Sequence, residues 1–465
     1  MQKPTLPKGT RDFGPEQMRK RLFIFDTIRQ TFQRFAFQPL ETPAMESLAT
    51  LMGKYGEEGD QLLFKILNSG DYAADLTELD IAVGSKKLTP KIAEKGLRYD
   101  LTVPFARYVV MNRNNLTMPF KRYQMQPVWR ADRPQKGRYR EFYQCDADVV
   151  GTDSLLCEAE IIFMIHEVFK NLGIDFTLKI NNRKILAGFA EVMGMPGQEG
   201  LLSVAIDKLD KIGPAKVLDE LREKGFTGEA LKMVQQIMGP LFMAQIENKD
   251  KTDLNDKLTD LENRLSRSEV GQKGVAELKE ILYLAKQYGL PLDNIEFDPT
   301  LARGLSYYTG AIFEVKARDI QIGSISGGGR YDNLTGALGM PGLSGVGISF
   351  GVDRIYDVME ERGLFGSNTE QGTLVLIAPF DTDARAYALP LLRQLREANI
   401  RAEMYPDVVK VKKMLDYANA KDIPFVVLIG SEEMQTGQLS LKNMITGEQR
   451  KATADEISQL VQPAA

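Results

Sequence analysis

The sequence predicts an α+β fold: an antiparallel sheet with flanking helices, a helical insertion, and a small α/β domain at the C-terminal end. Strand-like patterning runs from Leu97 to Gly151 and resumes at Ile295, while the intervening residues 184–290 are charged and helix-rich. From Leu374 onward strand and helix patterns alternate. A chain of 465 residues also requires more than one hydrophobic core. We therefore expect a core in two parts (1–183 and 291–365), an insertion (184–290) and a last domain (372–465).

The first part of the core is expected to begin and end with helices. Apolar residues recur at helical spacing behind Pro15, which suits a first helical turn: Leu22, Phe25, Ile28, Phe32 and Phe35. An extended, proline-marked segment, Gln38–Pro43, follows. The strand-like region contains a basic hairpin at Ala131–Arg140, and a long helix is expected from about Ser154 to Leu172, where Gly173 stops it.

The last domain shows the clearest alternation of elements. We expect, in order, a strand at 374–378, a helix at 382–398, a strand at 401–405, a helix at 408–420 and a strand at 425–429, then a hairpin and a terminal helix. This order predicts a largely parallel sheet. A polar linker, 366–371, separates the domain from the core.

Composition excludes several classes of protein. No apolar run is long enough to cross a bilayer, and the N-terminus carries no secretory h-region. The two cysteines, Cys145 and Cys157, lack metal-ligand spacing, so we expect free buried thiols, no structural metal and a reducing, cytoplasmic location. The net charge of −4 argues against a polyanion-binding coat but allows local basic patches.

Three segments carry chemically suggestive residues. The hairpin from Val128 to Gln144 gathers four arginines, a lysine and aromatic faces, which suits phosphate contact and base stacking as well as a solvated basic loop. In the second segment, Gly345–Arg354, glycines alternate with apolar residues, and Arg354 falls in the opening turn of a helix, where anions are favoured. The third, Leu301–Gly310, places an arginine beside two tyrosines shortly before Gly327–Asp332.

Together these segments resemble the motifs of the class II aminoacyl-tRNA synthetases. The first two are similar to motifs 2 and 3, and Phe37–Pro43 is similar to motif 1, which forms the dimer interface of that class. The peptides Arg303–Tyr308 and Gly327–Asp332 resemble the two signatures of the histidyl-tRNA synthetase family. The resemblance extends from Gly9 to the last domain. It implies a class II antiparallel sheet, an anticodon-binding-like domain, a homodimer, and ATP-dependent ligation of L-histidine to tRNA(His) through a histidyl-adenylate, with release of AMP and diphosphate.

The resemblance also implies roles for residues toward ATP, a substrate that we expect to bind with Mg²⁺. Arg130 matches the arginine that holds the α-phosphate, and Arg303 matches a family-specific arginine near the same group. Positive charge there would stabilise the transition state of adenylation. Asp132, Arg138, Phe142 and Arg354 match residues that contact the adenine amine, the outer phosphates and the two faces of the adenine.

For histidine, the resemblance assigns a second set of residues. Asp100 and Thr102 match residues that bind the α-ammonium, and Gln144 matches the group that orients the backbone atoms of the amino acid. Asp148 and Tyr308 match the pair that meets the two imidazole nitrogens, with Tyr307 packed alongside. Arg303 belongs to this set as well as to the ATP contacts. Such a site rejects apolar competitors because its buried polar groups would be left unpaired.

Two further observations bear on the mechanism. His166 is the only histidine and lies on the apolar 154–172 helix, where a structural role is expected. No nucleophile–histidine pair can then be formed, and none is needed, because the substrate carboxylate is itself the nucleophile. Lys410, Lys412 and Lys413 on the second helix of the last domain could touch the RNA backbone or simply be solvated.

Two alternatives share the resemblance. One is a catalytically inactive, synthetase-like regulatory subunit of histidine biosynthesis, and the other is a tRNA-sensing module of a larger kinase. Retention of Arg130, Arg303 and Arg354 argues against the first. Complete motifs and the absence of a kinase signature argue against the second.

Overall fold

The computed structural model describes residues 3–206, 209–236, 254–301, 307–318, 320–366 and 372–462. The chain divides into two compact units, one formed by residues 1–12 and 21–364 and the other by residues 13–20 and 365–465. In the described ranges, no helix is long and apolar enough to span a membrane. The expected linker, 366–371, lies outside these ranges except for its first residue.

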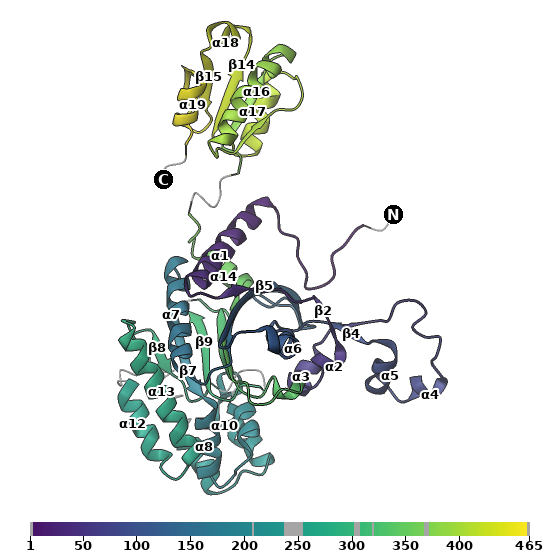
Figure 1. Ribbon diagram of the computed structural model, residues 1–465, viewed down its shortest axis with the longest axis vertical. Helices are drawn as coiled ribbons and strands as arrows, with labels where there is room; N and C mark the ends of the chain where they lie inside the picture. The colour runs from purple at the N-terminus through teal and green to yellow at the C-terminus, as the bar shows by residue number, and fades with distance from the viewer. Residues whose placement is uncertain are drawn as a thin grey trace. The chain divides into compact units, whose positions relative to one another are not determined.

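The first unit is organised around a curved eight-stranded sheet (Figure 1). Its strands, in spatial order, are β1 (Gln38–Pro39), β5 (Phe120–Trp129), β6 (Glu141–Val150), β11 (Gly345–Gly351), β10 (Ser326–Tyr331), β9 (Ala311–Ala317), β7 (Phe176–Asn182) and β8 (Ile295–Phe297). Only the outermost pairs, β1–β5 and β7–β8, are parallel, and the other five ladders are antiparallel. The expected antiparallel sheet is therefore confirmed.

Helices α1 (Pro15–Arg34) and α7 (Leu156–Asn171) cover one face of this sheet. Phe350 of β11 packs against Phe32 of α1 and Phe169 of α7. The ring of Phe350 therefore marks the covered face, and its neighbours Ser349 and Gly351 point to the other one. Both helices were expected from the sequence. Leu22 was expected on the buried side of α1 but is 48% exposed, and Ile24 is fully buried instead.

The region between Leu97 and Phe120 contradicts the strand-like expectation, because Thr102–Asn112 forms helix α6. Pro104 lies in the first turn, where its fixed φ angle and missing N–H fit a helix. The carboxylate of Asp100 accepts a hydrogen bond from the backbone N–H of Val103 (3.1 Å) and so satisfies one of the free donors at the helix start. The β-branched and aromatic content of α6 reflects its buried position, which local pattern alone cannot separate from a strand.

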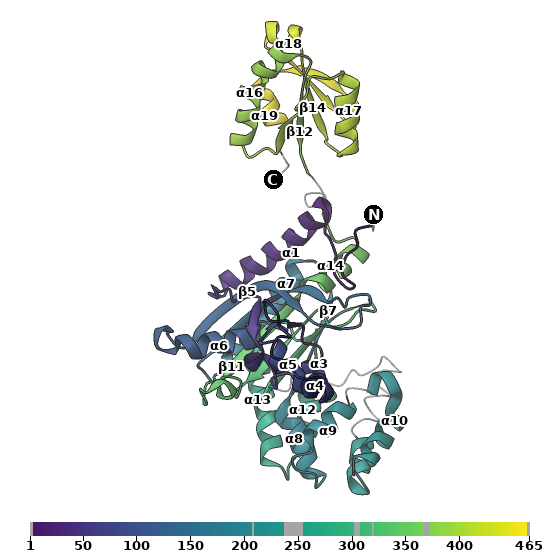
Figure 2. The same cartoon turned by 90° about the vertical axis from the view of Figure 1, so that its right-hand side faces the viewer.

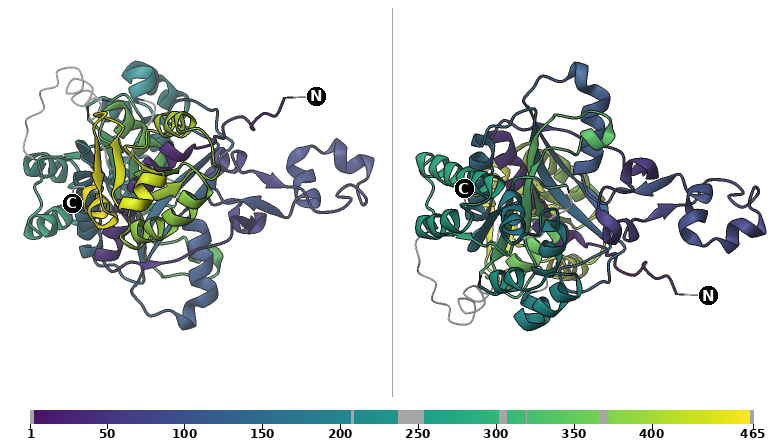
Figure 3. Two further views of the ribbon diagram at one scale, coloured as in Figure 1. Left: turned by 90° about the horizontal axis from the view of Figure 1, so that it is seen from above. Right: turned by 90° about the horizontal axis from the view of Figure 1, so that it is seen from below.

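Two smaller groups of elements complete the first unit. A three-stranded sheet, β2 (Met45–Ser47), β4 (Lys95–Leu97) and β3 (Lys65–Ile66), accompanies helices α2 (Leu48–Leu51), α3 (Gly56–Gln61), α4 (Glu78–Ala82) and α5 (Ser85–Ile92). The segment with α4 and α5 projects away from the large sheet (Figure 3). The expected insertion contains helices α8 (Arg183–Val192), α9 (Glu199–Ile206), α10 (Leu209–Glu223), α12 (Leu254–Arg264) and α13 (Glu269–Gln287). Helix α14 (Val352–Glu361) follows β11, and two short 3-10 helices span Arg113–Asn115 and Gly336–Leu338.

The second unit contains a five-stranded sheet in the order β13 (Ala402–Met404), β12 (Val375–Pro379), β14 (Phe425–Ile429), β15 (Leu439–Asn443) and β16 (Gln449–Ala452). Helices α16 (Thr382–Glu397) and α19 (Ala454–Leu460) lie on one face, and α17 (Val411–Ala420) lies on the other (Figure 2). The short helix α18 (Ser431–Thr436) was not expected. The sheet is parallel in β13–β12–β14 and antiparallel in β14–β15–β16, so it is less parallel than expected.

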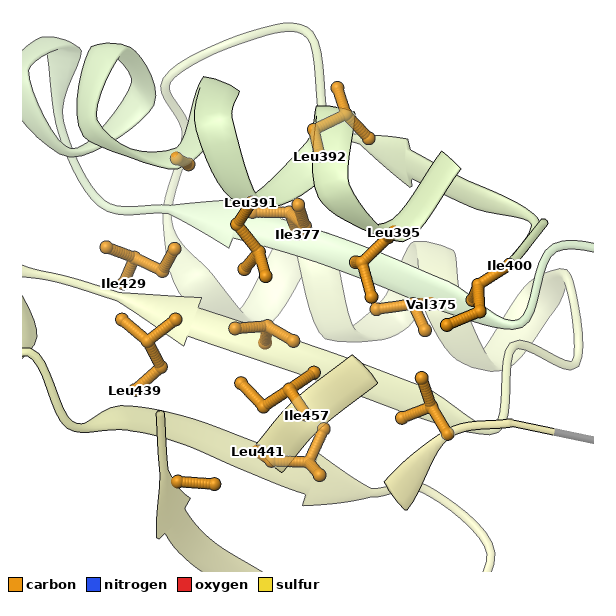
Figure 4. Close-up of a cluster of buried hydrophobic side chains, with 14 of the residues drawn as sticks. Val375, Ile377, Leu391, Leu392, Leu395, Ile400, Ile429, Leu439, Leu441 and Ile457 are labelled. Atoms are coloured by element: carbon orange, nitrogen blue, oxygen red, sulfur yellow. The ribbon is translucent and has the colours of Figure 1, made fainter. Parts of the chain in front are cut away.

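The core of this unit follows from strand alternation. Val375 and Ile377 of β12 pack with α16 and α19, whereas Leu376 and Ala378 pack with α17. Figure 4 shows the first of these clusters, in which leucines of α16 meet aliphatic side chains from the strands. Because both faces of β12 are buried, its sequence is a continuous apolar run.

Candidate active site

A cavity of about 280 Å³ lies on the sheet face opposite α1 and α7. It is bounded by β6, β9, β10 and β11, by the start of α6, and by the hairpin between β5 and β6. All of the described candidate residues except Asp148 line it: Asp100, Thr102, Arg130, Asp132, Arg138, Phe142, Gln144, Tyr307, Tyr308 and Arg354. Segments more than 200 residues apart in the sequence therefore meet at one site.

Asp100 is held in place before any ligand binds. Its side chain is almost fully buried, and its Oδ1 atom accepts hydrogen bonds from the Tyr55 hydroxyl (3.0 Å) and the Val103 N–H (3.1 Å). The hydroxyl of Tyr307 donates to Oδ2 (3.1 Å) and also has a side-chain hydrogen bond with Thr102. Burial raises the pKa of Asp100, while the Val103 bond and the charge of Arg130 act against this rise. A fixed carboxylate in this setting suits an ammonium group.

Arg130 lies at the end of β5, between aromatic rings. Its Nε donates to the carbonyl oxygen of Tyr99 (3.1 Å). The guanidinium carbon lies 4.2 Å from the centre of the Tyr99 ring and 5.2 Å from that of Phe142. Stacking of this kind restricts a long side chain to one orientation, so the charge is positioned in advance.

The hairpin between β5 and β6 is connected to Arg354 through backbone carbonyls. The Nε of Arg354 donates to the carbonyl of Gly137 (2.7 Å), and its Nη1 donates to the carbonyl of Ser324 (2.6 Å). Arg138, at the turn of the hairpin, is about half exposed and lies 3.8 Å from the Asp132 carboxylate. We call the group of Arg130, Arg138 and Arg354 the basic end of the cavity.

Gln144 and Asp146 share one hydroxyl, that of Ser349. The Nε2 atom of Gln144 donates to the Ser349 Oγ (2.7 Å), and Ser349 has a side-chain hydrogen bond with Asp146. Burial raises the pKa of Asp146 to about 7. The charge of Arg122 lowers this pKa, and the nearby carboxyl group of Asp148 raises it. In the described part of the chain, Oε1 of Gln144 and Oδ1 of Asp146 are buried without a hydrogen-bond partner.

Asp148 lines a second cavity, of about 20 Å³, next to the large one. One of its carboxylate oxygens lies 2.8 Å from Nη2 of the buried Arg122, and the other accepts from the Tyr331 hydroxyl (2.7 Å). Burial raises the pKa of Asp148, and Arg122 counteracts this. We call the group of Asp100, Asp146 and Asp148 the acidic end of the cavity.

Tyr307 and Tyr308 approach the acidic end from the loop before β9. Their rings meet edge to face with centres 5.1 Å apart, and Tyr308 lines both cavities. Burial raises the pKa of each phenol, so both hydroxyls remain hydrogen-bond donors at neutral pH. Arg303 lies outside the described residues.

Glycines form the floor of the cavity on β10 and β11. A Cβ atom on Gly347 would lie 2.0 Å from Oδ1 of Asp148, so no side chain fits there. A Cβ on Gly327 would meet only the Phe313 carbonyl, at 3.4 Å, and would otherwise point into the cavity that Gly327 lines. These glycines keep the floor flat, as the alternation of glycine and apolar residues indicates.

Sequence reasoning missed several residues that the structure places at the site. Asp146 and Ser349 line both cavities, Tyr55 holds Asp100, and Arg122 and Tyr331 hold Asp148. Alternation along β6 was the available signal for Asp146, because residues 144, 146 and 148 must share a face. Nothing local indicates Tyr55, which is 45 residues from Asp100 in the sequence.

The sequence also did not indicate that residues near the N-terminus support the basic hairpin. The buried carboxylate of Asp353 accepts hydrogen bonds from Arg11, from Arg21 (2.8 Å) and from the backbone N–H of Tyr143 (3.0 Å). Arg11 also lies over the ring of Tyr139, 3.3 Å from its centre. The N-terminal segment therefore fixes one side of the hairpin.

The remaining candidates lie where the sequence placed them, but away from the cavity. His166 is on α7, partly buried against Phe176, and burial lowers its pKa. Cys145 is buried and free, and Cys157 is free but only partly buried. Across the described ranges, no group of three or more His, Cys, Asp or Glu residues could hold a metal ion.

The site thus joins fixed arginines at one end to buried carboxylates and tyrosine hydroxyls at the other. The basic end can neutralise phosphate oxygens, and the acidic end can bind a small cation or a ring with N–H groups. Such a cavity can bring a phosphate ester and an amino acid into contact.

Comparison with known proteins identifies the family. A histidyl-tRNA synthetase family model matches residues 87–355, and an anticodon-binding domain model matches residues 374–463. A histidine–tRNA ligase of Cytophaga hutchinsonii is 59% identical over 98% of this chain and 99% of its own, and one of Phocaeicola vulgatus is 56% identical over 99% of both. The crystal structure of histidyl-tRNA synthetase from a Nostoc species is 31% identical, with a TM-score of 0.79 over 99% of both chains. The chain belongs to the histidyl-tRNA synthetase family.

Proposed function

We propose that the protein ligates L-histidine to tRNA(His) in two steps, forming a histidyl-adenylate from histidine and ATP and then transferring the histidyl group to the tRNA. The observation that carries the proposal is a single cavity with arginines at one end and buried carboxylates with tyrosines at the other. The relatives named above are ligases, which favours an active enzyme over an inactive regulatory subunit.

At the basic end, ATP would lie along the hairpin between β5 and β6. Arg130 would hold the α-phosphate and Arg138 the outer phosphates, while Phe142 and Arg354 would cover the two faces of the adenine. Asp132 would lie near the adenine amine. The proposal is supported by the fixed orientation of Arg130, whose Nε is bonded to Tyr99 and whose guanidinium is stacked on aromatic rings.

At the acidic end, histidine would place its ammonium group near Asp100 and Thr102 and its carboxylate toward Arg130. Gln144 would orient its backbone atoms, with Tyr307 packed alongside. Asp148 and Tyr308 would meet the imidazole. Support comes from the hydrogen bonds that already fix Asp100 and Asp148, since groups held in this way need no rearrangement on binding.

Chemistry then requires little more than positioning. The histidine carboxylate attacks the α-phosphorus, the bond to the diphosphate breaks, and the arginines stabilise the charge that develops. In the second step a hydroxyl of the terminal adenosine of the tRNA attacks the histidyl carbonyl, and AMP leaves. We assign Arg303 a place beside the α-phosphate on sequence resemblance alone.

The remaining parts of the proposal concern partners. Mg²⁺ would arrive on the phosphates of ATP, because this ion commonly binds to substrate phosphates. Residues 372–465 would bind the anticodon stem of the tRNA, with the exposed Lys410, Lys412 and Lys413 at the start of α17 available for its backbone. Residues 1–183 and 291–365 would form the catalytic core and 184–290 an insertion.

We also propose a homodimer that works in the cytosol, where tRNA and ATP are available. The Phe37–Pro43 segment resembles motif 1, and it contains β1, the edge strand of the large sheet. An isologous contact there would extend the sheet edge into a two-fold interface. Sedimentation equilibrium should give twice the chain mass, and an active monomer at micromolar concentration would refute this part.

Aminoacylation tests the proposed function directly. Purified protein with ATP, Mg²⁺ and labelled histidine should charge a tRNA(His) transcript and leave a tRNA(Phe) transcript uncharged. Omission of ATP should abolish the signal. Failure to charge tRNA(His), by protein that is folded by circular dichroism, would overturn the proposal.

A further inference from the structure

Asp146 lies at the junction of the two cavities. The linings of the large and the small cavity have six residues in common: Thr102, Asp146, Tyr308, Gly327, Gly328 and Ser349. On β6, Asp146 shares a face with Gln144 and Asp148, and it lies opposite Gln124 of β5 and Ser349 of β11. Its side chain is therefore directed to the same side of the sheet as the proposed histidine contacts.

One oxygen of this carboxyl group has no protein partner. Asp146 is 2% exposed, and its Oδ1 atom is buried without a hydrogen bond from any described residue. The Oε1 atom of Gln144 is in the same state nearby, and both side chains are held by Ser349. Oδ2 of Asp148 also lacks a hydrogen-bond partner among the described residues. A buried acceptor without a donor is costly, so three of them beside the two cavities indicate a ligand rich in N–H groups.

The charged neighbours do not satisfy Asp146. Arg122 is the cation that acts on it, but Nη2 of Arg122 lies 2.8 Å from Asp148 and donates to the carbonyl of Leu101 (3.2 Å). The Nε and Nη1 atoms of Arg122 are buried and make no hydrogen bond with Asp146 or with any other described residue. The other charged groups that act on Asp146 are the carboxyls of Asp148 and Asp100, which repel its negative charge. The alternative explanation is that Asp146 serves only as an additional counter-ion of Arg122, and a test must exclude this structural role.

The position of the orphan oxygen also distinguishes the two ends of the amino acid. Asp100, the proposed ammonium site, lines the large cavity and does not line the small one. With the substrate carboxylate toward Arg130 and the ammonium group at Asp100, the imidazole would point toward the small cavity, where Asp146, Asp148 and Tyr308 meet. The donors that reach Asp146 are therefore those of the ring.

We propose that Asp146 is a specificity-determining residue of the amino-acid subsite, whose Oδ1 atom accepts a hydrogen bond from a ring N–H of the substrate imidazole. This inference rests on the proposed function. It adds a second carboxyl group to the imidazole contacts, beside Asp148, whose Oδ1 accepts from Tyr331 and whose Oδ2 is ion-paired with Arg122 but accepts no hydrogen bond. An amino acid without a ring N–H would leave this acceptor unpaired and would be rejected for that reason.

Two substitutions separate this role from a structural one. Asp146→Ala removes the acceptor and the charge, whereas Asp146→Asn removes the charge but keeps a carbonyl oxygen at the same reach. In histidine-dependent ATP–pyrophosphate exchange, Asp146→Ala should raise the KM for histidine about ten- to hundredfold, while the KM for ATP stays within about twofold. Asp146→Asn should restore the KM for histidine to within a few-fold of the wild type.

A counter-ion role predicts a different pattern. Both variants lose the charge, so both should then lower the melting temperature equally and leave the KM for histidine unchanged, and that result would overturn the inference. Glu46→Ala is the matched control: Glu46 is a buried carboxylate paired with Arg107 and lines neither cavity, so it should change stability without changing the KM for histidine. Absence of histidine-dependent exchange in the wild type would instead overturn the proposed function.

Discussion

At the acidic end of the cavity the charged groups are carboxylates buried in the sheet, whereas at the basic end they are arginines fastened mainly by backbone carbonyls. Asp100 and Asp148 each receive hydrogen bonds from tyrosine hydroxyls, and Asp148 is paired with a fully buried arginine. Arg130 and Arg354 donate to the carbonyls of Tyr99, Gly137 and Ser324. Arg138 is about half exposed.

This difference separates selection from catalysis. A carbonyl orients an arginine without cancelling its charge, so the basic end keeps its positive potential for any triphosphate. Buried carboxylates and hydroxyls discriminate instead, because a wrong ligand leaves them unpaired in a low dielectric. Mutations at the basic end should therefore change rates, and mutations at the acidic end should change the affinity for the amino acid and the stability of the fold.

The largest effect is expected from Arg130→Ala. Its charge is positioned where the pentacoordinate phosphate would develop, and loss of one such donor typically costs about 3–4 kcal/mol, or roughly a hundred- to thousandfold in rate. Pyrophosphate exchange should fall by that factor, with the melting temperature within about 2 °C of the wild type. Arg133→Ala, on the exposed side of the same hairpin, is the control. Equal losses in both variants would show that only the total positive charge of the hairpin matters, and that the position of Arg130 does not.

Asp100→Asn should have the next largest effect. The substitution keeps the shape but removes the buried charge that three hydrogen bonds now support, and loss of such a charge partner costs about 2–3 kcal/mol. The KM for histidine should rise roughly thirty- to hundredfold, and the KM for ATP should not change. Asp153→Asn, in an exposed loop, should leave both constants at their wild-type values. A fall in kcat at constant KM would contradict the binding role of Asp100 and indicate a role in the chemical step.

A pair of glycine substitutions sharpens the distinction between ligand space and packing. A Cβ at Gly327 meets little of the protein, so Gly327→Ala should weaken substrate binding by about 1–2 kcal/mol. The KM should then rise roughly five- to thirtyfold, and the melting temperature should not change. Gly347→Ala places a methyl group against Asp148 and should lower the melting temperature as well. Calorimetry and exchange kinetics on both variants check this, and destabilisation by Gly327→Ala would contradict it.

The last effect concerns the pH dependence of stability. The pKa of Asp146 is about 7 in the folded protein and about 3.9 in an unfolded chain, so the folded state retains a proton between about pH 4 and pH 7 that the unfolded state releases. The contribution of this group to stability therefore falls as the pH rises through that window. Asp146→Asn should match the wild type near pH 4 and melt at a higher temperature above pH 7. A constant difference between the two melting curves would contradict the raised pKa.

The sequence predicts the parts of the site that depend on local pattern or on resemblance. Arg130, Phe142 and Gln144 could be named because their hairpin resembles motif 2 of the class II synthetases, and helices α1 and α7 follow from apolar spacing. Helix α6 could not be predicted, since its buried faces remove the polar periodicity that distinguishes a helix from a strand.

The supporting contacts were hidden for a different reason. Tyr55 and Asp100, or Arg122 and Tyr331 around Asp148, are brought together only by tertiary packing, and each residue taken alone resembles an ordinary core position. Asp146 is different, because strand alternation places it on the same face as Gln144 and Asp148, and its unpaired oxygen adds the structural observation.

The central claim is that the acidic end selects histidine by its ring N–H groups. ATP–pyrophosphate exchange with each of the twenty amino acids tests it most directly. The account predicts that histidine alone supports exchange and that glutamine, phenylalanine and asparagine do not rise above background at millimolar concentration. Comparable exchange with any other amino acid would contradict it.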